Sequence, residues 1–169
     1  MIAGSGRQQG DTARIFGTMK VLMVCLGNIC RSPLAHGILE QHAAEKGLDW
    51  EVDSAGTGSW HIGNPPDPRS VAVAAKHGLD ISQQRARQVH WPDLEAFDLV
   101  FAMDQSNYQD LMTMAQSDGE REKIRLIRDL EGSVKGMSVP DPYWDDDGFE
   151  QVYAMLDKAC SILVDQHAT

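Results

Sequence analysis

Near the start of the chain, one short stretch combines a thiol, a guanidinium and a loop. Residues 21–33 read VLMVCLGNICRSP, with Cys25 at the end of an apolar run and Arg31 six positions later. A thiolate is a nucleophile, and a guanidinium can hold a phosphate through two parallel hydrogen bonds. The spacing alone recurs by chance, so the surrounding residues must decide whether this pair performs chemistry.

The residues between the thiol and the guanidinium favour a tight loop that leads into a helix. Gly27 and Asn28 are the types that most readily adopt positive φ. Ser32 suits a helix N-cap, and Pro33 suits the first helical position. Such a loop turns backbone N–H groups inward, and the helix N-terminus adds partial positive charge. The sequence therefore predicts an anion cradle with the thiol of Cys25 at its base.

Three other interpretations of this stretch fit less well. A cysteine after a strand is usually inert, and a lone arginine is usually solvated, but here strand, loop, arginine and cap agree on one geometry. A nucleotide-binding loop needs a second glycine followed by lysine, which this loop lacks. A zinc site at Cys25 and Cys30 needs a second pair of ligands, and no such pair stands at ligand spacing elsewhere in the sequence.

Composition limits the classes of protein that the chain can be. Its 169 residues fit one domain, for which we expect residues 19–169. A net charge of −10 argues against nucleic acid and anionic membrane surfaces, and no apolar run reaches the length of a membrane span. Three cysteines fit a reducing compartment, so we expect a cytoplasmic protein. Residues 1–18 are polar and glycine-rich, and we expect a disordered leader, an expression remnant or an upstream start before Met19.

Strand and helix patterns alternate along the chain after this leader. Strands are expected at 20–25, 51–55, 98–103 and 123–126. Helices are expected at 32–46, 69–77, 91–97, 105–115 and 149–166. This alternation predicts an α/β fold with a four-stranded parallel sheet and helices on both faces. In such sheets ligands bind beyond the carboxyl ends of the strands, which is where Cys25 lies.

A second segment offers the acid that cleavage of a phosphate ester requires. The leaving oxygen must be protonated, which calls for a carboxylic acid near the cradle. Asp141 stands between two prolines that exclude it from a helix, and Tyr143 and Trp144 follow at once. The two aromatics could line a pocket for an aromatic substrate. Taken alone, the segment is more typical of a proline-rich turn held down by aromatic packing.

Taken together, these motifs resemble the low-molecular-weight protein tyrosine phosphatases. The family's phosphate-loop signature matches VCLGNICRSP at 24–33, and further landmarks match DSAGT at 53–57, PPDPR at 65–69, KHG at 76–78 and DPY at 141–143. The resemblance extends from residue 20 to about residue 166. It implies a flavodoxin-like three-layer sandwich and an enzyme that hydrolyses phosphotyrosine and small aryl phosphates through a cysteinyl-phosphate. It also implies that no metal and no cofactor takes part.

The resemblance also implies a role for each residue of the site. Cys25 would be the nucleophile, Arg31 would bind two phosphate oxygens, and Asp141 would protonate the leaving phenol and then activate water. Phosphate binding and support of the loop would fall to Leu26, Gly27, Asn28, Ile29, Cys30, Ser32, Ser54 and His77. The pocket wall would comprise Trp60, Tyr143 and Trp144.

Other activities on the same fold remain alternatives. Arsenate reductases of this fold use further downstream cysteines, whereas only Cys160 follows Arg31. Phosphoarginine-directed relatives have a threonine where this chain has Ile29, whose apolar side chain suits an aromatic ring. A non-catalytic phosphotyrosine-binding module would lack the nucleophile or the acid. We therefore expect a monomer that acts on tyrosine-phosphorylated proteins, with a bacterial tyrosine kinase as one candidate partner.

Overall fold

The computed structural model describes residues 18–168, and the statements below concern this range. The expected leader therefore lies outside the described residues, apart from Thr18. Both that leader and a domain boundary at residue 19 stay predictions. In the described range, no helix is both long and apolar enough to cross a membrane.

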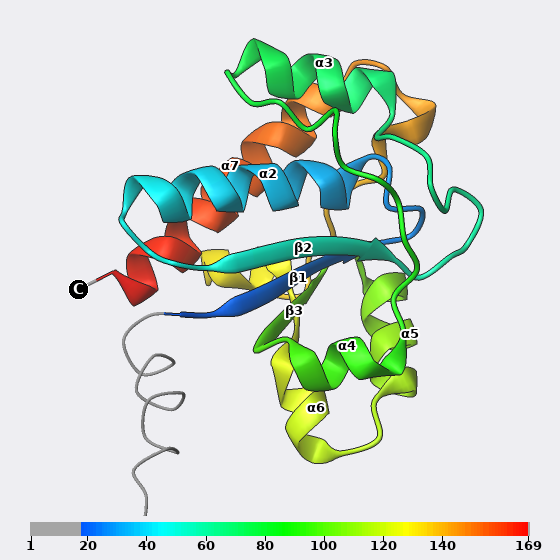
Figure 1. Cartoon of the computed structure of the whole chain (residues 1–169), viewed down its shortest axis with the longest axis vertical. Coiled ribbons are helices and arrows are strands. Elements are labelled where there is room, and N and C mark those ends of the chain that lie inside the picture. The colour runs from blue at the N-terminus through cyan, green and yellow to red at the C-terminus, as the bar shows by residue number, and fades with distance from the viewer. Residues whose placement is uncertain (1–17, 169) are drawn as a thin grey trace, which may run out of the picture.

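Four parallel strands form one sheet in the order β2–β1–β3–β4 (Figure 1). The two central strands are buried along almost their whole length, because their apolar side chains face helices on both sides. The predicted four-stranded parallel sheet is confirmed. The strands are β1 (Lys20–Cys25), β2 (Glu51–Gly56), β3 (Leu99–Ala102) and β4 (Ile124–Leu126).

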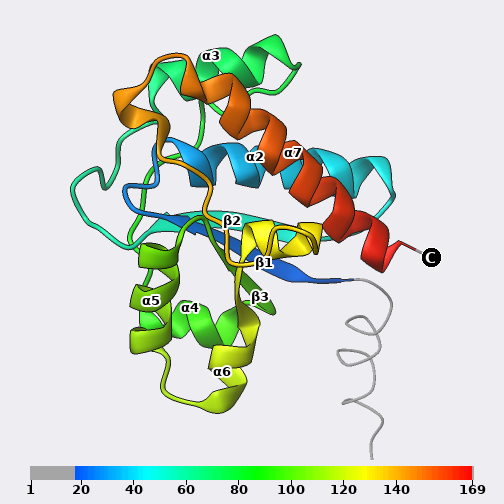
Figure 2. The ribbon, with the colours of Figure 1, turned by 180° about the vertical axis from the view of Figure 1, so that it is seen from behind.

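Helices cover both faces of this sheet (Figures 1 and 2). On one face lie α2 (Arg31–Glu45), α3 (Pro68–Lys76) and α7 (Gly148–His167). On the other face lie α4 (Trp91–Ala96), α5 (Gln105–Met114) and α6 (Asp118–Lys123). Along β1, Val21 and Met23 join the first core, whereas Leu22 and Val24 join the second. The flavodoxin-like three-layer sandwich that the sequence predicted is confirmed.

The structure differs from the predicted elements mainly where a segment is short or polar. Helix α6 was not predicted because its six residues are nearly all polar and too few for an apolar period. Two 3₁₀ helices, η1 (Ile127–Glu131) and η2 (Pro142–Trp144), were also missed. Ser32 was predicted as the N-cap of α2, which is wrong: the cap position is Cys30, and Ser32 lies inside the helix.

The sheet brings the carboxyl ends of its strands together at one edge. Cys25, the last residue of β1, lies opposite Gly56, the last residue of β2. On the other side of β1, Met103 follows β3 and its N–H donates to Val24. The loops that leave these three strand ends therefore meet at one place.

Candidate active site

The loop between β1 and α2, residues 25–31, is called the phosphate loop below. Asn28 adopts the left-handed conformation with φ of 56°, and in the described chain no other residue except glycine has positive φ. Gly27 was predicted to favour positive φ, but its φ is not positive. Its lack of a side chain matters for space, because a Cβ there would lie 3.0 Å from Cδ2 of His61.

The thiol of Cys25 is buried and surrounded by hydrogen-bond donors. Its Sγ lies 3.0 Å from Oγ of Ser32 and 3.3 Å from the N–H of Asn28. The Asn28 side-chain amide donates to Oγ of Ser32, so the hydroxyl proton can point to the sulfur at 3.0 Å or to the more distant carbonyl of Ala55 at 3.5 Å. Both donors, together with the N-terminus of α2, stabilise a negatively charged sulfur. The sulfur of Cys25 therefore lies among hydrogen-bond donors, as the predicted anion cradle requires.

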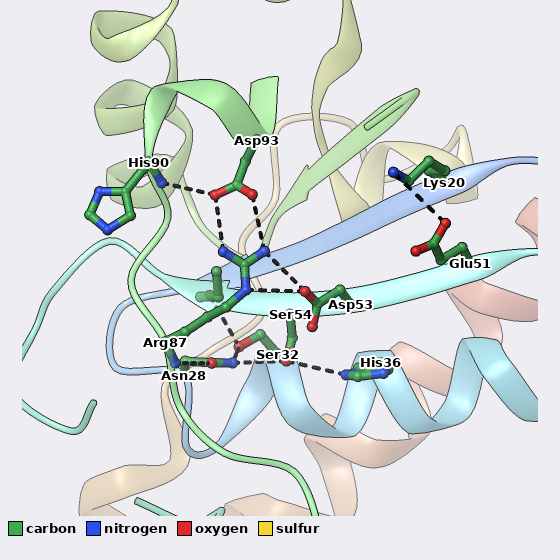
Figure 3. A network of polar contacts seen from close by, with 11 residues as sticks. Lys20, Asn28, Ser32, His36, Glu51, Asp53, Ser54, Arg87, His90 and Asp93 are labelled. Carbon is green, nitrogen blue, oxygen red and sulfur yellow. Dashed lines mark hydrogen bonds and ion pairs between the residues drawn. The ribbon is translucent and has the colours of Figure 1, made fainter. Parts of the chain in front are cut away.

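The buried amide of Asn28 connects the loop to the sheet (Figure 3). Its Nδ2 donates to Oγ of Ser32 at 2.8 Å and to Oγ of Ser54 at 3.0 Å. Its Oδ1 accepts from the N–H of Arg87 at 3.0 Å. The chain of contacts continues from Ser54 to Nδ1 of His36 at 3.3 Å. Both donors of this amide and one lone pair of its oxygen are therefore used to hold the loop.

Arg87 is a supporting residue that the sequence did not reveal. Its guanidinium binds the carboxylates of Asp53 and Asp93, with contacts of 3.0–3.2 Å (Figure 3). Burial lowers the pKa of Arg87, but the carboxylates more than offset this and hold it above the usual value. The backbone of Arg87 accepts from the N–H of Gly56 at 2.8 Å. Arg87 thus fixes the segment that orients Asn28. In the sequence, its role was indicated only indirectly, by the DSAGT motif that contains its partner Asp53.

Arg31 is almost fully buried, and one nitrogen of its guanidinium already donates two hydrogen bonds. Its Nη1 donates to Oδ2 of Asp104 at 2.7 Å and to the carbonyl of Val139 at 3.0 Å. Burial alone would lower the pKa of Arg31. Cys25 and Asp104 raise it by more than that, so the pKa lies above its usual value and the guanidinium stays charged. Its Nε has no partner among residues 18–168, and Nη2 has only Asp141 at 3.9 Å. The Nε–Nη2 edge therefore suits two phosphate oxygens.

Asp104 is a second functional residue that sequence reasoning missed. It is the second residue after β3, where its Oδ1 also accepts from the N–H of Asn107 and so caps α5. A carboxylate at the carboxyl end of a central parallel strand is a signal that could have identified it.

A cavity of about 290 Å³ opens above the phosphate loop. Cys25 and Arg31 lie in its lining, together with four further loop residues. Asp141 contributes a carboxylate, and Trp60, Tyr143 and Trp144 supply aromatic surface. The two tryptophans are highly exposed, and the rings of Tyr143 and Trp144 meet edge to face at 4.7 Å. The further lining residues are Leu26, Gly27, Ile29 and Cys30 of the loop, and His61, which was not predicted.

The structure does not bring His77 to the phosphate loop. Its ring stacks on Tyr153 with centroids 4.0 Å apart, and its Nε2 lies 3.0 Å from a carboxylate oxygen of Glu150. The predicted place of His77 beside Asn28 and Ser54 is therefore wrong. His77 stands at the C-terminal end of α3 and does not contact Ser54. The histidine that reaches Ser54 is His36, which belongs to α2.

Cys30 is a buried residue of the phosphate loop and is chemically unlike Cys25. Burial, together with the charges of Asp67, Cys25 and Asp141, raises the pKa of Cys30 to about 12. At neutral pH it is therefore a protonated, buried side chain. Two cysteines on one loop thus differ in the donors that surround them: Cys25 has several, whereas Cys30 faces negative charge.

Gly56 allows β2 to lie directly against the phosphate loop. A Cβ at this position would lie 2.7 Å from the carbonyl oxygen of Leu26 and 3.1 Å from the nitrogen of Asn28. Both contacts are with backbone, so no side chain could move aside. Any other residue would displace the loop.

Comparisons with known proteins identify the family. The family described as low molecular weight phosphotyrosine protein phosphatase matches residues 20–168. YfkJ of Bacillus subtilis, a low molecular weight protein-tyrosine-phosphatase, is 41% identical over 148 residues, which is 86% of this chain and 94% of the relative. Its crystal structure superposes with a TM-score of 0.82 at 38% identity, covering 89% of this chain and 94% of that chain.

Two further structures show how widely the fold is shared. A protein tyrosine phosphatase from Entamoeba histolytica gives a TM-score of 0.82 at 36% identity, covering 88% of this chain and 96% of that chain. A structure described as a drosophila arginine phosphatase gives 0.81 at 34%, covering 89% and 99%. The near-complete match of the family and the relative above 40% identity settle the assignment. The chain belongs to the low molecular weight phosphotyrosine protein phosphatase family.

Proposed function

We propose that the protein hydrolyses phosphotyrosine in proteins in two steps, through a cysteinyl-phosphate on Cys25. The observation that carries the proposal is the arrangement of three groups around one cavity. Cys25, whose sulfur has two hydrogen-bond donors, Arg31 and Asp141 all line it, and the carboxyl group of Asp141 lies 3.9 Å from the Arg31 guanidinium.

In the first step, the thiolate of Cys25 attacks phosphorus as the phosphorus–phenol bond breaks. Nε and Nη2 of Arg31 bind two non-bridging oxygens and stabilise the charge of the transition state. Asp141 gives its proton to the departing phenol oxygen. The products of this step are tyrosine and a phosphorylated cysteine.

In the second step, water attacks the phosphorus of the cysteinyl-phosphate. The carboxylate of Asp141 accepts a proton from this water, and the sulfur–phosphorus bond breaks. The hydroxyl of Ser32 donates to the sulfur as it departs, at the 3.0 Å seen here. Inorganic phosphate leaves, and the thiolate is regenerated.

The apolar wall supports phosphotyrosine over phosphoarginine as the substrate. Ile29 lines the cavity and offers no hydrogen bond to a guanidinium, whereas it can pack against a phenyl ring. The fold does not separate the two activities, because a drosophila arginine phosphatase superposes almost as well as the tyrosine phosphatases. Initial rates on a phosphotyrosine peptide and a phosphoarginine peptide should differ by about 100-fold or more, the range that a single unmet polar contact can produce.

The nucleophile is tested by replacing Cys25 with serine. Cys25→Ser should lower kcat by about a million-fold, as for loss of other activated nucleophiles, while phosphate still binds. Cys160→Ala is the matched control, because Cys160 is also buried but lies in α7. Residual activity above about 1% would contradict the proposal, given the expected loss. Thiol-coupled reduction of arsenate by the wild type, without hydrolysis of p-nitrophenyl phosphate, would instead support the arsenate alternative.

The finer biological setting is also proposed. We expect a monomeric, cytoplasmic enzyme whose substrates include a bacterial tyrosine kinase. Support comes from the negative net charge and the three reduced cysteines. Capture of phosphoproteins by Asp141→Ala in a native lysate, with light scattering of the purified chain, tests both points.

A further inference from the structure

An arginine outside the cavity joins the two sides of the site. Arg69, in the first turn of α3, binds Asp67 in bidentate fashion, with Nε–Oδ1 at 3.0 Å and Nη2–Oδ2 at 2.9 Å. Its Nη1 donates to Oδ1 of Asp146 at 2.5 Å. The guanidinium also lies over two rings, with Cζ 5.5 Å from the centroid of Tyr143 and 4.7 Å from that of Phe149. Two of these partners, Asp146 and Tyr143, belong to residues 139–147, called the acid loop below.

The same turn of α3 is fastened to the phosphate loop. The N–H of Asp67 donates to the carbonyl of Ile29 at 2.8 Å, and Oγ of Ser70 donates to the carbonyl of Cys30 at 3.1 Å. Both Asp67 and Ser70 are buried. Arg69, held on Asp67, is therefore fixed relative to the phosphate loop and reaches from there to the acid loop.

Arg31 also touches the acid loop. Its Nη1 donates to the carbonyl of Val139 at the start of that loop, but its contact with Asp141 itself cannot persist during the reaction. In the proposed mechanism its Nη2 binds phosphate, so its contact with Asp141 competes with substrate. Arg69 is absent from the cavity lining and meets no such competition. The hydrogen bonds that Arg69 donates to Asp67 and Asp146 hold its pKa above the usual value, so its charge is constant.

We propose that Arg69 is a positioning residue that sets Asp141 relative to Cys25, by holding the acid loop through Asp146 and Tyr143. The inference rests on the proposed function, because it takes Asp141 as the general acid. Arg69 acts at a distance from the substrate, so its effect must pass through Asp141. That requirement makes the inference testable by a double-mutant cycle.

Asp146→Asn is the sharpest variant, because it releases the acid loop and leaves the Arg69–Asp67 pair intact. Asp147→Asn is the matched control: it makes the same charge change at the next residue, whose carboxylate forms no hydrogen bond or ion pair within residues 18–168. Each change is made in the wild type and in Asp141→Asn. The readout is kcat/KM with phenyl phosphate, a poor leaving group, and with p-nitrophenyl phosphate, a good one, alongside the melting temperature.

Asp146→Asn should lower kcat/KM for phenyl phosphate about three- to fivefold, the upper range for loss of one exposed ion pair. The loss with p-nitrophenyl phosphate should stay below about twofold, because that leaving group needs little protonation. Arg69→Met, which removes the whole connection, should cost about tenfold with phenyl phosphate, as expected for several small contacts together. Neither change should add to the loss already present in Asp141→Asn, and Asp147→Asn should change nothing.

Equal losses on both substrates, or an undiminished loss in the Asp141→Asn background, would overturn the inference and leave the proposed function standing. A loss in Asp147→Asn as large as in Asp146→Asn would do the same. If Asp141→Asn itself lost activity equally on both substrates, the general-acid assignment would fall, and this inference with it.

Discussion

The phosphate loop and the acid loop are held in opposite ways. Around the phosphate loop, Cys25, Asn28 and Arg31 are each at most 3% exposed and are fixed by buried hydrogen bonds. In the acid loop, the Asp141 side chain is 40% exposed and Trp144 is 87% exposed. The group that must remain an anion lies where the protein excludes water, whereas the group that must exchange protons with water stays accessible to it.

This contrast also predicts where substitutions will be costly. Leaving a buried partner unsatisfied typically costs about 1–3 kcal/mol, whereas an exposed ion pair contributes about 0–1 kcal/mol. Changes to the phosphate loop should therefore lower both stability and activity. Changes to the acid loop should lower activity alone.

The largest effect on stability is expected from Asn28→Ala. It removes three hydrogen bonds, two of them to the buried hydroxyls of Ser32 and Ser54, and places alanine at φ of 56°, so we expect a loss of about 3–4 kcal/mol. Asn28→Gly is the matched control, since it removes the same side chain but tolerates the backbone, and should be about 1 kcal/mol less harmful. Urea unfolding at neutral pH measures both. Equal losses of unfolding free energy in Asn28→Ala and Asn28→Gly would show that the positive φ at residue 28 does not strain an alanine there.

A smaller loss is expected when the partner of Arg31 is neutralised. Asp104→Asn keeps the cap of α5 but removes the charge opposite a buried guanidinium, so stability should fall by about 2 kcal/mol. KM should rise about tenfold because Arg31 loses its orientation. Asp145→Asn in the acid loop should cost below about 0.5 kcal/mol, as for other surface changes. A comparable loss at both positions would remove the contrast between the two loops.

The buried thiol of Cys30 in the phosphate loop predicts a pH dependence of stability of similar size. The pKa of Cys30 rises from 9.0 to about 12 on folding, so between these values the unfolded chain releases a proton that the folded protein keeps. Stability is therefore fully present below pH 9 and falls as pH rises, by about 2 kcal/mol at pH 10.5. The free energy of unfolding, measured with urea, should therefore be lower at pH 10.5 than at pH 8. Cys30→Ala should remove the part of this difference that Cys30 causes. An unchanged difference would assign the alkaline loss to other groups.

The smallest effect is expected at the far end of the Asn28 network. Nε2 of His36 lies 2.6 Å from the Glu40 carboxylate and must donate to it, so Nδ1 can accept from Ser54. His36→Gln should lower kcat/KM about two- to fivefold, the value of one modest hydrogen bond, and should add nothing in a Ser54→Ala background. His42→Gln is the control, because His42 lies on the same helix as His36, α2, but pairs with Asp157 of α7. Equal effects of both histidines would mean that only helix stability had changed.

The parts predicted from sequence are those that local patterns determine. The apolar runs of β1 and β3 marked the central strands, since burial on both faces leaves no polar position. Cys25 and Arg31 share one short loop, so their spacing alone placed them together. The prolines that flank Asp141 predicted that it lies outside a helix, and the structure places it in an extended conformation just before η2.

The parts that were missed depend on contacts between distant segments. Asp104 meets Arg31 across 73 residues, and Arg87 meets Asn28 across 59. No periodic pattern encodes such pairs, since they arise only when the sheet aligns its strand ends. The wrong placement of His77 has the same origin, because a motif fixes a residue's position in the chain but not which neighbour its side chain reaches.

Gly56 has a consequence for how activity is recognised in related sequences. A single methyl group there would press on the back of the phosphate loop, at the carbonyl of Leu26, with no side chain free to yield. The resulting protein would keep Cys25, Arg31 and Asp141 and would still look complete to any search for its signature. A pseudoenzyme could thus arise in this fold without the loss of one reactive group, through a residue that never meets the substrate.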